Sequence, residues 1–95
     1  MNPFEITFKK PFVFEGKDYE KIDLSGIEDL ATKDLIDADK QFNAAGNMAM
    51  LNETQTAYSC IIASKATKLP VEFFEKLPVR YGVQVKSVVM NFLNA

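Results

Sequence analysis

Polar and apolar residues alternate at the start of the chain. Phe4, Ile6 and Phe8 are each separated by one polar residue, the period of two that is typical of a half-buried β-strand. Pro11 interrupts the pattern, as proline does at the edge or at the start of a strand. Further on, Gly16 suits the first central position of a type II′ turn, so this region predicts a β-hairpin.

The register of this hairpin contains a conflict. In a strict two-residue loop Phe14 faces Tyr19, and this pairing leaves Ile22 and Leu24 on the opposite face from the aromatic residues. A bulge near Glu20, or a sheet that packs on both faces, would resolve the conflict.

From Ser25 onward the apolar residues recur at helical spacing. Ser25 and Glu28 have the spacing of a capping box, and Thr32 is expected to cap a longer helix at about 33–45 that ends near Gly46. The apolar positions of that helix are Leu35, Ile36, Ala38 and Phe42. The chain therefore changes from strands to helices near residue 25.

A second helix is predicted after a loop. The composition of residues 43–47 predicts a mobile loop. Asn52 and Gln55 have the spacing of an N-cap residue and an N3 residue, which predicts the start of a helix that runs to about Ala66. One stripe of this helix is mostly bulky: Leu51, Thr54, Tyr58, Ile61 and Ile62. Its neighbouring stripe is small: Ala57, Cys60, Ser64 and Thr67. The small stripe predicts a side that another helix can approach closely.

Two prolines mark the next boundaries. Pro70 is expected at the first position of a short helix, Val71 to Leu77, and Pro78 at the first position of a final helix over 79–93. Gly82 inside the final helix costs about 1 kcal/mol relative to alanine. Either a close backbone contact or simple tolerance would explain it.

Together these elements predict an α+β fold. Residues 1–95 are expected to form a single domain, with a β-hairpin or small antiparallel sheet in 1–24 followed by about four α-helices in 25–95. A hydrophobic share of 47% and eight phenylalanines are typical of an ordinary globular protein with one core.

The composition limits the kinds of site that the chain can form. The chain has no histidine and a single cysteine, Cys60, so no intramolecular disulfide and no zinc site of the usual ligand set can form. Cys60 lies in the small stripe, which favours packing over a nucleophilic role. The start of the chain lacks the apolar run of a secretory signal, and no stretch is long enough to span a bilayer. We expect a cytosolic protein that does not bind membranes.

Charge is unevenly distributed along the chain. The net charge is −2, but residues 15–40 hold nine acids against four bases, and residues 65–95 hold five bases against two acids. Opposite patches can guide head-to-tail self-association, although solvated faces without a role explain the same pattern.

Carboxylates and basic residues offer two further readings. Asp34, Asp37 and Asp39 lie close together on the first long helix and could hold a hard cation. Acids near a helix start are favoured by the helix dipole in any case, and we expect no metal.

The bases Lys65, Lys68, Lys76, Arg80 and Lys86 lie near Phe73, Phe74 and Tyr81, as nucleic-acid binding would require. The overall negative charge, with a pI near 5.0, argues against nucleic acid as a partner.

Aromatic residues point instead to protein binding. Phe73 and Phe74 are consecutive, so a short surface helix can bury one and leave the other partly exposed beside Leu77 and Tyr81. These four residues are the candidate protein-binding residues. The alternative is that both phenylalanines belong to the core.

The order of the motifs resembles that of a known family. The first half contains Ile6-Thr-Phe-Lys-Lys-Pro11, Gly16, Tyr19, Ile22-Asp-Leu24, Asp29-Leu30 and Asp34-Leu35; the second contains Tyr58, Ala66, Leu69-Pro70, Phe74, Leu77-Pro78, Val85, Val88 and Phe92-Leu93. In this order, over about residues 6–93, the chain resembles the tail assembly chaperones of long-tailed phages. One departure is Val79-Arg80-Tyr81, where relatives often carry an acidic residue.

This resemblance implies a function without catalysis or cofactors. Such a protein acts in the host bacterial cytoplasm, binds the tape measure protein and promotes assembly of the tail tube, with the tail tube protein as a further partner. It is absent from the mature virion, and some members form homo-oligomers or occur as a longer frameshifted product. Two alternatives remain: a structural minor tail or head-tail connector protein, and a small enzyme that uses Asp34 and Asp37.

Overall fold

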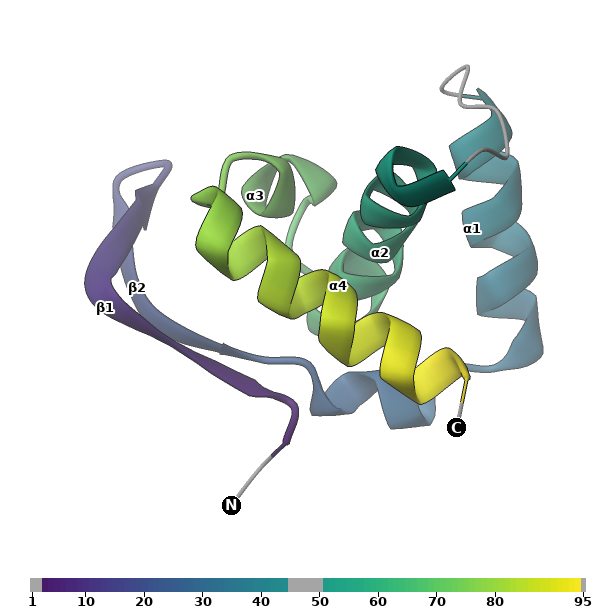
Figure 1. The fold of residues 1–95 in the computed structure, drawn as a ribbon, viewed down its shortest axis with the longest axis horizontal. Helices are drawn as coiled ribbons and strands as arrows, with labels where there is room; N and C mark the ends of the chain where they lie inside the picture. Colours follow the sequence, from purple (N-terminus) through teal and green to yellow (C-terminus); the bar gives the residue numbers. More distant parts are fainter. Residues whose placement is uncertain (1–2, 45–50, 95) are drawn as a thin grey trace.

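The computed structural model describes residues 3–44 and 51–94, and shows a β-hairpin packed at one end of a group of helices (Figure 1). The elements in chain order are β1 (Glu5–Phe14), β2 (Lys17–Asp23), a short 3₁₀ helix η1 (Ser25–Asp29), α1 (Thr32–Ala44), α2 (Leu51–Thr67), α3 (Val71–Glu75) and α4 (Val79–Leu93). A two-stranded antiparallel sheet followed by four α-helices confirms the predicted α+β class. Within the described ranges, no helix is both long and apolar enough to cross a membrane.

The hairpin turn differs from the prediction. Phe14 pairs with Lys17, so the loop consists of Glu15 and Gly16, whose φ angles are 51° and 78°. Positive φ at both central positions is the mark of a type I′ turn, which places the glycine second rather than first. The predicted type II′ turn, and the pairing of Phe14 with Tyr19, are therefore wrong. The strand twist favours the type I′ geometry even though Glu15 must adopt a left-handed conformation.

An irregularity in the ladder resolves the predicted conflict between the faces. Regular pairing stops at Thr7 and resumes at Phe12, and Glu20 alone separates their two partners on β2. The extra residues in β1 allow β2 to twist between Tyr19 and Ile22. Both of these side chains therefore face the helices. Of the two alternatives, the structure shows an irregularity opposite Glu20, with the inserted residues on β1.

The residues predicted to begin or cap the helices lie one position away from their predicted roles. Thr32 is already inside α1, and the Ala31 N–H donates a hydrogen bond of 2.8 Å to the Asp34 carboxylate. Pro70 and Pro78 occupy the cap positions before α3 and α4 rather than the first helical positions. A cap residue keeps an extended ψ, which suits the rigid ring equally well. The final helix has the predicted bounds, whereas α3 ends two residues before the predicted Leu77.

Helix α2 is the central element of the helical part. Residues 59–63 are all buried, because α1, α3, α4 and η1 surround this helix. The closest approach is at Gly26 of η1, where an added Cβ would collide with the Ala66 carbonyl. The predicted loop over 43–47 begins inside α1, which extends to Ala44, and its remaining residues lie outside the described ones. The side chains predicted to cap α2 also lie outside the described part of the chain.

Candidate protein-binding surface

The four predicted binding residues lie in the core. Phe73, Phe74, Leu77 and Tyr81 are 0%, 2%, 7% and 8% exposed. The expectation that one phenylalanine remains partly exposed is wrong, and the alternative that both belong to the core is confirmed. The physical reason is that the hairpin covers the side of α3 that carries Phe73, while α3 also packs against α2 (Figure 1).

Phe73 is the centre of an aromatic cluster. Its ring makes edge contacts with the rings of Phe12, Phe14, Tyr19 and Phe74, at centroid distances of 5.2, 5.3, 4.8 and 5.0 Å. Edge-to-face geometry at these distances is the favoured arrangement for aromatic rings. We call these five residues the aromatic cluster. It joins the hairpin to α3.

Tyr81 makes a second link between hairpin and helices. Its ring packs on Phe8 with a centroid distance of 4.7 Å, and its hydroxyl oxygen accepts a hydrogen bond of 2.8 Å from the Lys9 N–H. Lys9 lies in the part of β1 that has no regular pairing with β2. Tyr81 therefore accepts a hydrogen bond from a backbone N–H that the regular strand pairing does not use. The hydroxyl therefore has a structural role.

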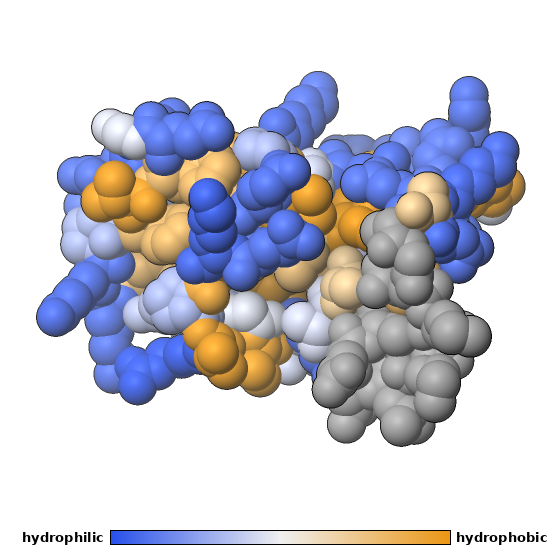
Figure 2. Space-filling model, turned by 90° about the horizontal axis from the view of Figure 1, so that it is seen from above, coloured by the Kyte–Doolittle hydropathy of each residue, from blue (hydrophilic) through white to orange (hydrophobic). Residues whose placement is uncertain are grey.

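Beside α3, on the side away from the hairpin, helices α2, α3 and α4 leave an open groove of about 470 Å³. Its walls are mainly apolar: Ala57, Cys60, Phe74, Leu77, Val79 and Val83, with Thr56, Glu75 and Gly82. We call this the apolar groove. Val79 and Val83 of α4 are 80% and 55% exposed and lie one helical turn apart at its edge. Elsewhere on the face seen from above, hydrophilic side chains separate the apolar patches (Figure 2).

Gly82 contributes to this opening without being forced to be glycine. A Cβ at this position would meet nothing within 4 Å. Simple tolerance, rather than a close backbone contact, therefore explains the glycine inside α4.

Cys60 forms part of the wall of the apolar groove and is unsuited to nucleophilic chemistry. Burial, and secondarily the negative charge of Glu75, raise the pKa of its thiol to about 11. A thiol with this pKa is almost fully protonated near neutral pH and is a poor nucleophile. The predicted packing role is consistent with these properties.

Two of the three aspartates of α1 are engaged in local structure. Asp34 accepts the Ala31 N–H at the helix start, and Asp39 forms a hydrogen bond with Tyr58 of α2. Burial and this aspartate together raise the pKa of the Tyr58 hydroxyl to about 12. Within the described parts of the chain, no three metal-binding side chains come together, and Asp37 joins no such group.

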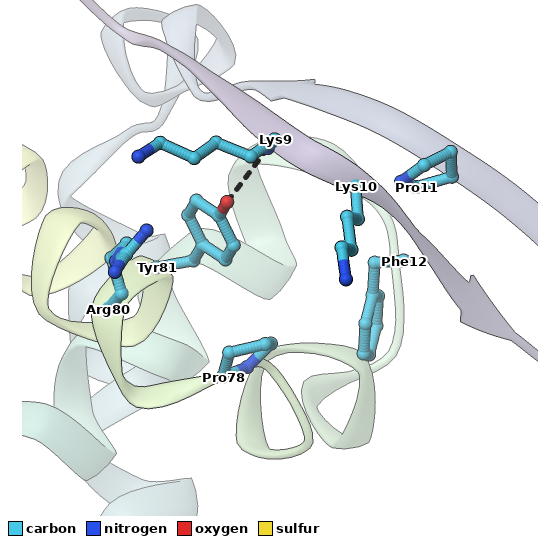
Figure 3. Close-up of a pocket in the computed structure, with 7 residues that line it drawn as sticks. All are labelled: Lys9, Lys10, Pro11, Phe12, Pro78, Arg80 and Tyr81. Carbon is cyan, nitrogen blue, oxygen red and sulfur yellow. Dashed lines mark hydrogen bonds between the residues drawn. The ribbon is translucent and has the colours of Figure 1, made fainter.

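The basic residues do not form the aromatic-lined stripe that nucleic-acid binding would require, because Phe73, Phe74 and Tyr81 are buried. Arg80 instead lies near Lys9 and Lys10 of β1, around a second hollow of about 300 Å³ (Figure 3). Sequence reasoning missed the two lysines. The available signal was the pair Lys9-Lys10 before a proline, two adjacent cations inside a strand that otherwise alternates.

Comparisons with protein-family models, with curated proteins and with solved structures found no match to this chain. The indications of function are therefore the surfaces themselves and the order of the sequence motifs.

Proposed function

We propose that this chain is a phage tail assembly chaperone, which binds the tape measure protein in the bacterial cytoplasm and promotes assembly of the tail tube. The proposal rests on one structural observation, the apolar groove with exposed Val79 and Val83 at its edge. The order of motifs over residues 6–93 supplies the choice of client. The tail tube protein is a second proposed partner.

The shape and chemistry of the apolar groove suit a helical client. Helices bind in grooves through apolar side chains three or four residues apart, and Val79 and Val83 present the complementary spacing along α4. The walls offer few hydrogen-bonding groups, so binding depends on apolar contact rather than on a specific sequence. A tape measure protein is a long helical chain, and many copies of a weak binder could cover its apolar seams.

Co-expression with the tape measure protein of the same tail gene cluster tests this proposal. We expect the client to remain in the soluble fraction and to co-purify with the wild-type chain. Val79→Glu combined with Val83→Glu places two charges at the groove edge and should abolish co-purification, because an unpaired charge at an apolar contact is costly.

Val13→Glu is the matched control. Val13 is 61% exposed, similar to the groove valines, but lies on the hairpin. It should leave co-purification unchanged. If the control abolishes binding as fully as the double variant, or if neither has any effect, the apolar groove is not the client site.

A structural minor tail or head-tail connector protein is the alternative. The proposed chaperone leaves before the virion is complete, whereas a structural component stays in the particle. Quantitative mass spectrometry of purified virions separates them, since one or more copies per particle would exclude the chaperone.

A further inference from the structure

The fold gathers three cations from distant parts of the sequence around one hollow, which we call the basic notch. Lys9 and Lys10 come from β1 and Arg80 from the first turn of α4. The hydrogen bond from the Lys9 N–H to the Tyr81 hydroxyl holds the two elements together at this point. The remaining walls are apolar or aromatic: Pro11, Phe12, Pro78 and the Tyr81 ring.

The side chains surround the opening from several directions. Figure 3 shows Lys10 reaching from β1 between Tyr81 and Phe12, with Pro78 at the other side of the hollow. Lys9 and Arg80 lie on the far side of the Tyr81 ring. A group that enters the basic notch would therefore meet an apolar floor and cations at its rim.

The charges at this rim are not neutralised within the described part of the chain. No described acidic residue lines the basic notch, and neither lysine nor the arginine forms an ion pair with a described residue. All three side chains are exposed. A cluster of one sign beside a low-dielectric wall attracts and orients an anionic partner.

We infer that the basic notch binds an acidic peptide segment that carries one apolar side chain. The apolar floor accepts the side chain, while the rim pairs with flanking carboxylates, to which a guanidinium such as that of Arg80 can donate two parallel hydrogen bonds.

The observations favour a peptide over nucleic acid. Base stacking needs an open aromatic face, but Tyr81 is buried and the ring of Phe12 packs against Phe73. The net charge of −2 also disfavours binding of a long polyanion. A short acidic segment at the basic notch avoids both difficulties.

The basic notch is separate from the apolar groove. The two hollows border α4 but share no lining residue. The inference therefore stands or falls independently of the proposed function.

Fluorescence anisotropy with a labelled peptide tests the inference. The probe places glutamates and aspartates on both sides of a single phenylalanine, and a matched peptide replaces every acid by glutamine or asparagine. We expect the acidic peptide to bind, with an affinity that falls as salt rises from about 0.05 M to about 0.5 M. The matched peptide should bind at least about tenfold more weakly.

Charge reversal locates the site. Lys10→Glu combined with Arg80→Glu should weaken binding about tenfold or more, since several ion pairs become repulsions. Lys33→Glu combined with Lys40→Glu changes the net charge equally at exposed positions of α1 and should alter affinity by no more than about twofold. Circular dichroism checks that both variants are folded.

Several results would overturn the inference. One is equal weakening by the two double variants, which would mean that only net charge matters. Another is tight binding of the uncharged peptide, or no binding of the acidic one up to about 1 mM. Tighter binding of a labelled RNA oligonucleotide, lost in the same Lys10 and Arg80 variant, would assign the basic notch to nucleic acid instead.

Discussion

The two sides of α3 are covered very differently. On one side the hairpin closes over Phe73, whose ring contacts four other aromatic rings and has no exposed surface. On the other side Phe74 and Leu77 border the apolar groove, and nothing in the described chain covers the valines at its edge. The chain therefore uses its aromatic residues for internal packing and leaves aliphatic residues at the open surface.

This difference separates stability from binding. A fully buried aromatic side chain contributes to the folded state through both burial and ring contacts. An exposed valine contributes little to folding, because its surface stays in water, and gains only when a partner covers it. Substitutions on the two sides should thus have different consequences.

The largest effect is expected at the centre of the aromatic cluster. Phe73→Ala should lower the free energy of unfolding by about 3–5 kcal/mol, because it removes a buried ring and leaves a cavity between hairpin and helices. Urea denaturation followed by circular dichroism measures this loss. Val79→Ala and Val83→Ala, on the open side, should each change stability by less than about 0.5 kcal/mol.

The next largest effect concerns Cys60 and chemical reactivity. Alkylation requires the thiolate, and raising the thiol pKa from 9.0 to about 11 lowers the thiolate fraction near neutral pH about a hundredfold. We expect iodoacetamide to react with the folded chain at least about a hundredfold more slowly than with the chain in urea. Mass spectrometry over time gives both rates.

The pH dependence follows from the same shift. The folded state favours the neutral thiol of Cys60. The contribution of this thiol to the free energy of unfolding is therefore complete below pH 9 and is lost as the pH rises through about 11. Equal alkylation rates in the folded and unfolded chain would show that the wall of the apolar groove is open at Cys60.

Local patterns in the sequence predict most of the fold. The period of two in β1, the prolines before α3 and α4, and the helical spacing after residue 25 depend on neighbouring residues, and each corresponds to an observed element. The type of turn in the hairpin was harder to predict from the sequence. Choosing between Gly16 as first or second central residue depends on how the two strands twist and pair, which a glycine alone does not specify.

The binding surface was predicted poorly for a different reason. Whether Phe73 is exposed depends on where the hairpin, about 60 residues away along the chain, packs in space, and no local pattern contains that information. The basic notch has the same origin, since Lys9 and Arg80 meet only in the folded chain. Aromatic residues are good indicators of binding only when the fold leaves them uncovered.

A third prediction sharpens the contrast between tightly packed and open positions. Gly26→Ala should destabilise the chain by about 1–3 kcal/mol, because the new Cβ collides with the Ala66 carbonyl and η1 must move away from α2. Thermal unfolding measures the change. An unchanged melting temperature would mean that η1 adjusts without loss of packing.

The last prediction, and the only one of increased stability, concerns Gly82. Gly82→Ala should raise the free energy of unfolding by about 0.5–1 kcal/mol, because alanine favours the helix and the new Cβ meets nothing within 4 Å. Parallel urea titrations of Gly82→Ala and Gly26→Ala provide the comparison, since the same substitution should have opposite signs at the two positions. If both glycines reject alanine, the space beside α4 is closed, and the apolar groove cannot accept a client side chain there. If Gly82→Ala stabilises the chain while a larger residue, as in Gly82→Leu, prevents client binding without loss of stability, the open side of α3 serves binding rather than folding.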